Sequence, residues 1–405
     1  MVAQQGTFEW AYVKIGDCLS FKNGLNKGKE YFGHGTPIIN YMDVYANPAI
    51  TANDIEGTVE VTDSEISRFE AKKNDVFFTR TSETPEEVGY ASVLLDDIDD
   101  CVFSGFVLRG RPTSSRLYPG YCAYCFMSWP VRSEIERSCT YTTRALTNGK
   151  VLSAIEMPLP PYEEQVRIAE ALSDIDELIE NLEKLIEKKK NIKTGAMQEL
   201  LTGKRRLPGF DGEWSCCRLK DISKWVSGGT PSTQNASFWN GRVPWISSSD
   251  LISNSIDIAS ITKYVSEEAI AKSAATICEG PTIHVIVRVG LGKVAISQGG
   301  IATSQDFCNL VDVEGDVVFL GYFLMRQMCV VAKSAQGTSI QGINSRDLLE
   351  KEILLPSLEE QRAIAEVLSD MDAEISQLQD KLDKYKRLKA GMMDELLTGR
   401  IRLVD

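Results

Sequence analysis

The apolar positions of two long stretches of the chain follow a heptad pattern. Starting at Ile168 and again at Ile364, apolar side chains recur at alternating steps of four and three residues. This spacing is typical of the a/d seam of a coiled coil and not of a strand, whose period is two. Proline before each stretch, with Gly203 and Gly399 after them, marks the ends of two helices of about 40 residues, or about 60 Å each. The positions expected to pair these helices are Ile168, Leu172, Ile175, Ile179, Leu182, Ile364, Leu368, Met371, Ile375 and Leu378.

Charge predicts how the two helices pair. Each helix begins with acidic residues, such as Glu163 and Glu359, and continues into a basic segment that includes Lys189 and Lys386. A parallel pair would place acid beside acid and base beside base, whereas an antiparallel pair places unlike charges together. Exposed ion pairs contribute little stability, but the sign of the interaction still selects an orientation. We therefore expect the helices to be antiparallel.

The helices belong to an internal repeat. Leu159-Pro160-Pro161-Tyr162-Glu163-Glu164-Gln165 returns as Leu355-Pro356-Ser357-Leu358-Glu359-Glu360-Gln361, an offset of 196 residues (355 − 159). Leu-Leu-Thr-Gly at 200–203 returns at 396–399 with the same offset, and roughly half of the aligned positions are identical. An ungapped copy of this length implies one structural unit used twice. The chain is therefore expected to have internal pseudo-twofold symmetry.

The segments that precede the helices repeat more loosely. Trp10 to Asp17 parallels Trp214 to Asp221 at an offset of 204, and Pro37-Ile38-Ile39 parallels Pro244-Trp245-Ile246. Val76 to Arg80 is aligned with His284 to Arg288. Both segments read as mixtures of helix and strand, so the predicted fold class is α+β. Divergent loops on a repeated frame are where recognition usually resides.

The composition argues against a membrane protein, a secreted protein and a metal-binding protein. The 405 residues are 43% hydrophobic and carry a net charge of −13, without a membrane-spanning apolar run or a signal-peptide pattern. A cytoplasmic protein without a membrane association is the expectation. Cys122-x-x-Cys125 has no second ligand pair, and a buried aromatic-rich helix from Tyr121 to Trp129 explains it better than a metal site. The acidic balance argues against tight DNA binding by the chain alone, while leaving room for local basic faces.

No catalytic set is apparent in the sequence. The two histidines, His34 and His284, are too few for a histidine-based triad or metal cluster, and no GxxxxGK[ST] phosphate loop is present. Pro160-Pro161-Tyr162 is similar to the end of an amino-methyltransferase motif, but Leu159 stands where the amine-binding side chain is required. The chain is expected to be neither an enzyme nor a binder of metals or cofactors.

Several loops carry groups suited to a polar ligand. The glycine- and hydroxyl-rich stretch at 227–232 offers backbone N–H groups, and Arg80 and Arg288 follow strand-like runs. Gln305 beside Ser304 could contact adenine, and an arginine could contact guanine. Each feature alone is more often a turn or a solvated side chain.

Over its full length the chain resembles the specificity subunits of type I restriction-modification systems. The resemblance rests on the repeated Leu-Pro-x-x-Glu-Glu-Gln, the heptad helices, the repeated Leu-Leu-Thr-Gly, and Lys204 to Phe210. Gly228-Gly229-Thr230-Pro231-Ser232 with the following Phe238 to Gly241 adds to it. At 288–292 the chain has Arg-Val-Gly-Leu-Gly where the family often has Arg-Ala-x-Ile-Gly, which affects the predicted shape of that loop.

The resemblance implies two target-recognition domains, each reading one half of a split double-stranded DNA site, with an antiparallel coiled coil setting the spacer. The implied division is recognition domain 1 at 1–157, helical region 1 at 158–207, recognition domain 2 at 208–354 and helical region 2 at 355–405. Two DNA methyltransferase subunits and the restriction subunits would be its partners, and these would use S-adenosylmethionine, ATP and magnesium. The candidate DNA contacts are Lys22, Thr79, Arg80, Thr81, Ser82, Arg109, Gly229, Thr230, Ser232, Ser247, Arg288, Ser304 and Gln305.

Two other classes compete with this interpretation. A fused methyltransferase-endonuclease would need an intact catalytic motif and a nuclease carboxylate cluster, for which the chain is too short. A non-catalytic coiled-coil scaffold that pairs two ligand-binding domains without reading DNA is the remaining alternative.

Overall fold

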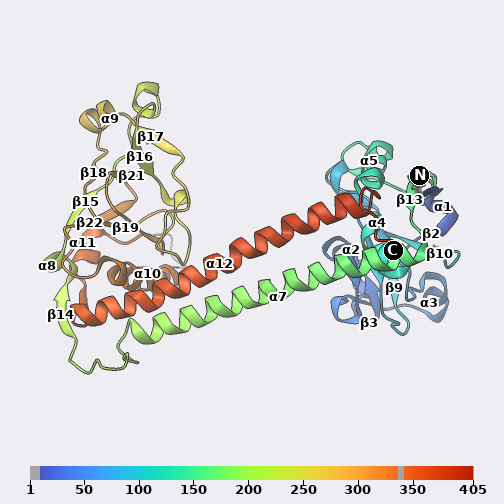
Figure 1. Ribbon diagram of the computed structural model, residues 1–405, viewed down its shortest axis with the longest axis horizontal. Helices are drawn as coiled ribbons and strands as arrows, with labels where there is room; N and C mark the ends of the chain where they lie inside the picture. Colours follow the sequence, from blue (N-terminus) through green and yellow to red (C-terminus); the bar gives the residue numbers. More distant parts are fainter. Residues whose placement is uncertain (1–9, 336–341, 405) are drawn as a thin grey trace, which may run out of the picture. The chain divides into compact units, whose positions relative to one another are not determined.

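The computed structural model describes residues 10–335 and 342–404, which form two compact units. Unit 1 contains residues 1–182 and 381–405, and unit 2 contains residues 183–380. Each unit thus combines one globular segment with the beginning of one long helix and the end of the other (Figure 1). The sequence predicted four consecutive segments. Each compact unit instead combines one predicted recognition domain with parts of both predicted helical regions.

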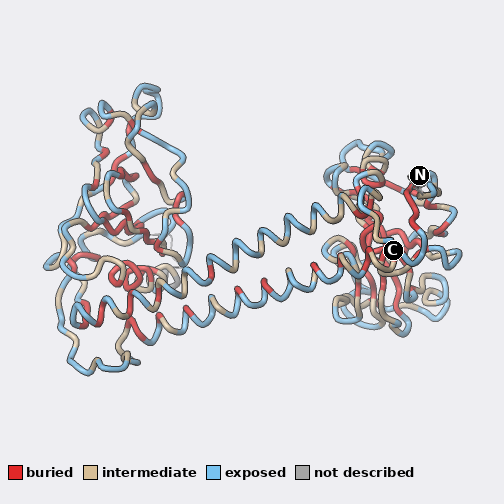
Figure 2. Tube along the Cα trace, in the orientation of Figure 1, coloured by how far each residue is buried: buried red, intermediate tan, exposed pale blue. Residues whose placement is uncertain are grey.

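Both predicted long helices are present. Helix α7 spans Tyr162–Leu200 and helix α12 spans Leu358–Leu396, with 39 residues each. Gly203 and Gly399, which follow them, have φ values of 69° and 73°, in the left-handed region where glycine ends helices without strain. Most of the expected pairing positions are buried, and Ile179, Met371 and Leu378 are half-buried. In Figure 2 buried positions recur along α7, whereas α12 between Ile375 and Leu396 is half-buried or exposed.

The helices are antiparallel, as charge predicted. In unit 1, Ile168 from the beginning of α7 shares a hydrophobic cluster with Leu396 and Leu397 from the end of α12. In unit 2, Ile364 from the beginning of α12 shares a cluster with Leu200 from the end of α7. A parallel pair would have placed Ile168 beside Ile364. The beginning of each helix also packs against the globular part of its unit, since these clusters include the domain cores.

The repeated Glu-Glu-Gln motif makes equivalent buried hydrogen bonds in each unit. The buried Glu164 carboxylate accepts hydrogen bonds from Arg402 Nε at 2.8 Å and Trp10 Nε1 at 3.0 Å in unit 1. In unit 2, Glu360 accepts from Arg206 Nε and Nη2 at 2.6 Å each. Burial raises the pKa of Glu164, but Arg402 and Trp10 more than offset this and lower it overall. The second glutamate of each motif therefore joins the beginning of one helix to the chain that follows the other.

The glutamines of the same motif fasten the globular part to the helix. Gln165 Oε1 accepts from the Tyr118 N–H at 2.8 Å, and Gln361 Oε1 accepts from the Asp316 N–H at 2.9 Å. Each glutamine also donates to the carbonyl of the first motif proline, Pro160 or Pro356. The two copies of the motif are thus similar in sequence because they make the same contacts between a long helix and a globular segment.

Unit 1 is built on a five-stranded sheet with strand order β2-β10-β6-β8-β4. A second sheet has the order β5-β3-β9, a third has the order β11-β12-β7, and β1 pairs with β13 next to α7. The strands are β1 Ala11–Lys14, β2 Leu19–Asn23, β3 Phe32–Ile39, β4 Ala49–Ile50, β5 Thr58–Val59, β6 Val76–Thr79, β7 Thr81–Ser82, β8 Ala91–Leu94, β9 Val102–Phe103, β10 Val107–Pro112, β11 Thr140–Tyr141, β12 Ala145–Leu146 and β13 Glu156–Leu159. The helices are α1 Ile15–Cys18, α2 Tyr41–Ala46, α3 Asp63–Phe69, α4 Pro119–Cys125, α5 Trp129–Ser138 and α6 Gly149–Ala154.

Unit 2 repeats this plan. Its main sheet has the order β15-β22-β19-β20, its second sheet has the order β17-β16-β21-β18, and β14 pairs with β23. The strands are β14 Ser215–Arg218, β15 Lys224–Ser227, β16 Val243–Ile246, β17 Lys263–Val265, β18 Ile277–Cys278, β19 Thr282–Ile286, β20 Val294–Ser297, β21 Ile301–Thr303, β22 Phe307–Val311 and β23 Glu352–Leu355. The helices are α8 Leu219–Ile222, α9 Glu267–Lys272, α10 Val317–Ala335 and α11 Ser345–Leu349.

The predicted buried aromatic-rich helix is shorter than expected. Cys122 and Cys125 are buried on α4 among Tyr121 and Phe126, and the chain then starts a separate helix at Trp129, which is 72% exposed. Within the described ranges, no group of histidine, cysteine, aspartate and glutamate side chains is arranged to hold a metal ion. Over the same residues, no helix has the length and apolar character needed to cross a bilayer.

Candidate nucleic-acid interface

Four of the predicted contacts in unit 2 gather in loops at the carboxyl ends of β15, β16 and β21. The Thr230 hydroxyl donates to Gln305 Oε1, and both side chains are exposed. The Ser304 N–H donates to the Ile246 carbonyl at 2.9 Å, which places Ser304 beside Ser247. These loops follow β15, β16 and β21, and we call them the loop edge of unit 2.

Gly228 explains why the loops come so close. A Cβ atom at this position would lie 2.0 Å from the Ser304 carbonyl oxygen, so only glycine fits. Gly229 also packs internally, because its N–H donates to the Thr303 carbonyl and its carbonyl accepts from Trp245 Nε1 at 3.0 Å. The glycine pair therefore holds the loop edge together, and the backbone groups of Gly229 are already engaged. Ser232 lies exposed on the same loop.

Unit 1 has an equivalent loop edge. Gly24 occupies the place of Gly228, since a Cβ there would lie 2.2 Å from the Ser104 carbonyl oxygen. The Ser104 N–H donates to the Ile39 carbonyl at 2.9 Å, as Ser304 does to Ile246. The two edges share a backbone frame but carry different side chains: Asn26, Asn40, Gly105 and Phe106 in unit 1 stand where unit 2 has Thr230, Ser247, Gln305 and Asp306.

Arg80 belongs to the loop edge of unit 1. Its N–H donates to the Phe106 carbonyl at 3.0 Å, and its guanidinium donates to the Gly105 carbonyl at 3.4 Å. Phe106 is 63% exposed directly beside it. Thr81, half-buried in β7, follows Arg80. An exposed aromatic ring next to an arginine is suited to stacking and hydrogen bonding with bases.

The alignment of Arg80 with Arg288 was wrong by one residue. Thr79 pairs with Val107 and Ile286 pairs with Phe307, which makes Arg80 equivalent to Val287. The Val287 N–H donates to the Asp306 carbonyl at 2.8 Å, the bond that Arg80 makes to Phe106. A shift of one residue reverses the face of a strand, so the two arginines are not counterparts. Arg288 is nevertheless exposed at the end of β19.

Three predicted contacts of unit 1 lie in its interior. Thr79 is fully buried and accepts from the Tyr90 N–H at 2.9 Å, and Ser82 donates to Glu87 at 3.0 Å. Arg109, 7% exposed, donates to the Glu70 carbonyl at 2.6 Å. These side chains are engaged in packing, which separates them from the loop edge. Lys22 is half-buried on β2 opposite Arg109, and its ammonium donates to the Arg68 carbonyl.

His284 forms a buried polar network in unit 2. Its Nδ1 lies 2.8 Å from Asn309 Oδ1, and its Nε2 lies 2.8 Å from Ser297 Oγ. Asn309 Nδ2 also donates to Thr303 Oγ1 at 2.8 Å, next to the loop edge. Burial lowers the pKa of His284 from 6.5 to about 4, so the ring is neutral at physiological pH.

This network predicts a pH dependence of stability. Because the pKa of folded His284 lies below that of the unfolded chain, the unfolded state binds more protons between about 6.5 and 4. Its contribution is complete above pH 6.5 and is lost as the pH falls toward 4, by about 3 kcal/mol. Urea unfolding of the wild type and of His284→Phe, the residue that unit 1 has at Phe77, should give a difference that varies over this window. The chain has two histidines, so NMR titration can follow each ring, and a His284 pKa near 6.5 would contradict the prediction.

Sequence reasoning missed Asn26, Asn40 and Phe106. The offset of 204 that relates Trp10 to Trp214 also relates Asn26 to Thr230, so the repeat could have identified this residue. The offset of 207 between Pro37 and Pro244 likewise relates Asn40 to Ser247. Phe106 has no such signal, because an apolar residue that begins a strand-like run does not reveal that it is exposed at the tip of a turn.

Comparisons with solved structures support the architecture. The type I restriction-modification S subunit from M. genitalium has a TM-score of 0.57 at 16% identity, covering 97% of both chains. A chain solved in work on complex assembly and conformational transition of the type I R-M system has a TM-score of 0.63 at 16% identity, covering 97% of this chain and 98% of that chain. At this identity the likeness concerns the fold.

Sequence comparisons identify the family. A putative type I restriction enzyme MjaX specificity subunit from Methanocaldococcus jannaschii is 22% identical over 410 residues, spanning 98% of this chain and 94% of that protein. The Escherichia coli EcoR124I/EcoR124II specificity subunit is 29% identical over 187 residues, which cover 44% of this chain and 46% of that protein. The family model for the type I restriction modification DNA specificity domain matches residues 8–191 and 211–384. With two such matches over most of its length, the chain belongs to the type I restriction-modification specificity subunit family.

Proposed function

We propose that this chain reads a split DNA site, with one half-site contacted by the loop edge of each unit. The observation that carries the proposal is the pair of loop edges, which share one backbone frame and differ in nearly every side chain. A repeated frame with different readout groups is what two unlike half-sites require. The helices support it, because each unit holds the beginning of one helix against the end of the other in the same way.

The chemistry of the two edges suits base recognition. Unit 1 offers the amides of Asn26 and Asn40, the Arg80 guanidinium and the exposed Phe106 ring. Unit 2 offers the hydroxyls of Thr230, Ser232 and Ser247, with Gln305 and Arg288. The predicted contact Ser304 is only 3% exposed, and its hydroxyl donates to Asp306, so this side chain shapes the loop edge. Amides can pair with adenine and arginine with guanine in the major groove. Lys22 and Thr81 remain candidates for backbone contacts, whereas the buried Thr79, Ser82 and Arg109 and the engaged Gly229 are assigned to shaping the domains.

The chain would act as the non-catalytic subunit of a larger assembly. Two methyltransferase subunits, using S-adenosylmethionine, would modify the DNA, and restriction subunits, using ATP and magnesium, would cut it in the cytoplasm. The net charge of −13 favours this arrangement, because partner subunits would supply much of the phosphate neutralisation. A scaffold that joins two ligand-binding domains without reading DNA is the alternative, and it predicts no sequence dependence.

Exchange of one recognition domain tests the proposal. Replacing residues 1–157 by the corresponding segment of another specificity subunit, in cells that also produce the methyltransferase subunits, should change one half of the methylated motif. The other half should stay the same, because unit 2 keeps its own loop edge. Methylome sequencing reads both halves, and a reciprocal exchange of residues 208–354 is the matched control.

The outcomes separate the two functions. Unchanged methylation, or a change in both halves, would contradict independent reading by two units. Purified chain given S-adenosylmethionine but no partner is expected to leave DNA unmethylated. Methylation by the chain alone would refute its assignment as a non-catalytic subunit.

A further inference from the structure

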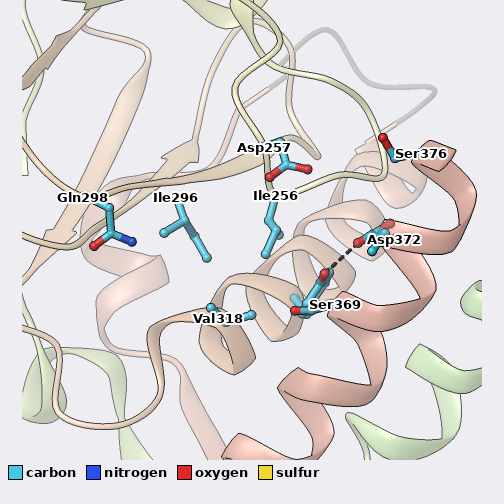
Figure 3. A pocket seen from close by; sticks show the side chains of 10 residues that line it. Ile256, Asp257, Ile296, Gln298, Val318, Ser369, Asp372 and Ser376 are labelled. Atoms are coloured by element: carbon cyan, nitrogen blue, oxygen red, sulfur yellow. Dashed lines mark hydrogen bonds between the residues drawn. The ribbon is translucent and has the colours of Figure 1, made fainter. Parts of the chain in front are cut away.

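Unit 2 contains a buried cluster of a tyrosine, an aspartate and a lysine. Lys193 Nζ, near the end of α7, donates to both carboxylate oxygens of Asp372 on α12, at 2.5 and 2.6 Å. The Tyr322 hydroxyl on α10 donates to the same carboxylate at 2.6 Å. Asp372 lines a cavity of about 470 Å³ together with Ser369 (Figure 3). Three elements therefore meet at one carboxylate.

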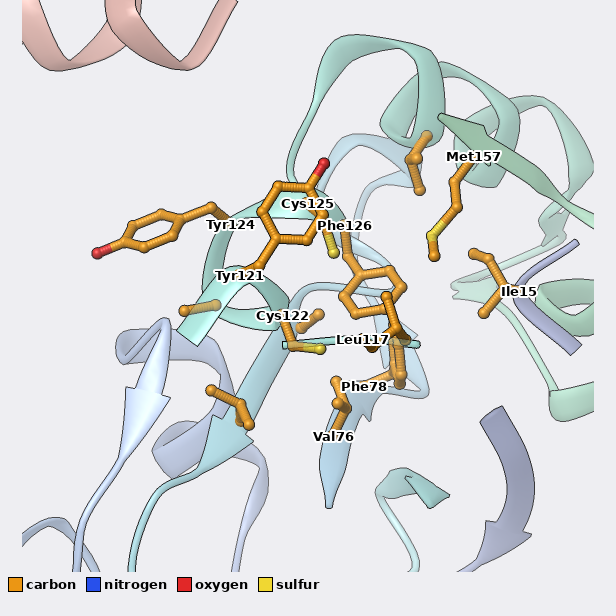
Figure 4. Close-up of a cluster of buried hydrophobic side chains, with 14 of the residues drawn as sticks. Ile15, Val76, Phe78, Leu117, Tyr121, Cys122, Tyr124, Cys125, Phe126 and Met157 are labelled. Carbon is orange, nitrogen blue, oxygen red and sulfur yellow. The ribbon is translucent and has the colours of Figure 1, made fainter. Parts of the chain in front are cut away.

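Unit 1 contains the same cluster in the equivalent place. Lys389 Nζ, near the end of α12, lies 2.5 Å from Asp176 Oδ1 on α7, and the Tyr124 hydroxyl donates to Asp176 at 3.0 Å. Tyr124 projects away from the other labelled side chains of the unit 1 core (Figure 4). The aspartates and the lysines are each separated by the repeat offset of 196 residues (372 − 176 and 389 − 193). Because both interactions recur in the two units, an accidental contact is an inadequate explanation.

Each cluster connects both helices to the recognition domain of its unit. The lysine comes from the end of one helix, the aspartate from the first half of the other, and the tyrosine from α4 or α10. Each ammonium also lies over the tyrosine ring, at 5.1 Å for Lys193 and 5.8 Å for Lys389. Burial and the neighbouring carboxylate raise the pKa of both tyrosines, which therefore stay protonated donors.

The buried lysine of unit 2 opposes a change in the register of the helices. Lys193 is 5% exposed, so sliding one helix along the other would separate its ammonium from the Asp372 carboxylate in a largely buried site. The Lys389–Asp176 pair of unit 1 is partly exposed and opposes such a slide less strongly. The apolar seam alone cannot prevent such a slide, because a heptad pattern is satisfied again after seven residues. The nearby Lys189–Glu374 pair, at 2.6 Å, is more exposed than the lysine–aspartate pair of either cluster, and it lacks a counterpart because Tyr385 stands at the equivalent position. An exposed pair is screened and constrains register weakly.

We propose that the two Tyr–Asp–Lys clusters are spacer-determining positions, which fix the register of α7 against α12 and thereby the distance between half-sites. This inference rests on the proposed reading of a split DNA site. It assigns the half-sites to the loop edges and the length of the spacer to Asp176, Lys389, Asp372 and Lys193. The tyrosines position each recognition domain on the helices without contacting DNA.

Methylome sequencing of cells that produce the full chain with its methyltransferase subunits tests the proposal. The wild type should methylate one spacer length. The double variant Lys193→Glu with Lys389→Glu should keep both half-site sequences but methylate additional spacer lengths, with about tenfold less methylation at the original one. Adding Asp176→Lys and Asp372→Lys, which restores opposite charges in both clusters, should recover the single spacer. Lys189→Glu, the same change at the exposed pair, is the matched control and should leave the motif unchanged.

Each result bears on one proposal. An unchanged spacer at full occupancy in the double variant would overturn the role of the clusters while leaving the reading of a split site intact. A wild-type chain that supports no bipartite methylation would instead refute the proposed function. If the double variant does not fold, Lys193→Gln with Lys389→Gln removes the charges without adding repulsion. A wild-type motif at wild-type occupancy in that variant would equally overturn the inference.

Discussion

Replacing Asp75 by asparagine is expected to destabilise unit 1 by about 3–5 kcal/mol. Asp75 is 1% exposed and accepts from Arg111 Nε and Nη2 at 2.7 Å each, while Arg109 Nε lies 3.9 Å from it. Asparagine keeps the shape of the side chain but removes the negative charge. The two arginines would then lose the carboxylate between them. Arg111 is partly exposed and keeps Glu70, but Arg109, being 7% exposed, cannot turn to water.

Substitutions at three carboxylates of different exposure separate the effect of burial from the loss of a charge. Glu70 Oε1 accepts from Arg111 Nη1 at 2.8 Å, but its side chain is 32% exposed, so Glu70→Gln should cost less than about 1 kcal/mol. Asp97→Asn, at an exposed loop position, should be neutral within about 0.5 kcal/mol. Urea unfolding monitored by circular dichroism measures all three. Equal effects of the Asp75 and Glu70 substitutions would show that burial does not set the cost.

The Asp75 cluster also shows why the sequence alone did not reveal which polar side chains are buried. Arg109 and Thr79 were candidate DNA contacts because arginine and threonine are the residue types that bind nucleic acid. The same types occur in a core when a partner such as Asp75 or Tyr90 is present, and that partner lies distant in sequence or across a sheet. The exposure of a polar side chain in a strand cannot be read from its identity.

The helices could be predicted because their determinants are local. The heptad steps from Ile168, the glycine at 203 and the charge gradient act within one helix or between two copies of one sequence. The role of Glu164 could not be predicted in the same way, because its partners Trp10 and Arg402 are at opposite ends of the chain. The repeat identified the motif as structural, and the structure supplied the contact.

The loop edges were predicted in part. Thr230, Ser304 and Gln305 were chosen for their chemistry, and the structure brings them together through close backbone approaches at Gly228. The equivalence of Arg80 with Arg288 failed because the repeat in the globular segments changes its offset from 204 to 207 through insertions in loops. A similarity of a few apolar residues does not fix a strand register to one residue, whereas hydrogen-bonded pairing does.

Lengthening both long helices by the same number of residues should lengthen the DNA spacer. Each unit holds the beginning of one helix and the end of the other, so an insertion in α7 alone would leave the helices unequal. Matched insertions of seven residues, after Leu182 and after Leu378, preserve the heptad seam and keep both Tyr–Asp–Lys clusters within their own units. Seven residues add about 10 Å of helix, equivalent to about three base pairs of DNA.

The expected product is a methylated motif with both half-sites unchanged and a spacer longer by about three base pairs. Occupancy should be below that of the wild type, because three base pairs also turn the second half-site by about 100° around the DNA axis. Matched insertions of three heptads add about 32 Å, close to a full DNA turn of 34–36 Å. They should return both half-sites to the same side of the duplex and restore the occupancy. A single matched residue would rotate the seam by about 100° and should abolish methylation. Methylome sequencing of the three variants compares these outcomes, and an original spacer retained at full occupancy after the seven-residue insertions would show that the helices do not measure DNA.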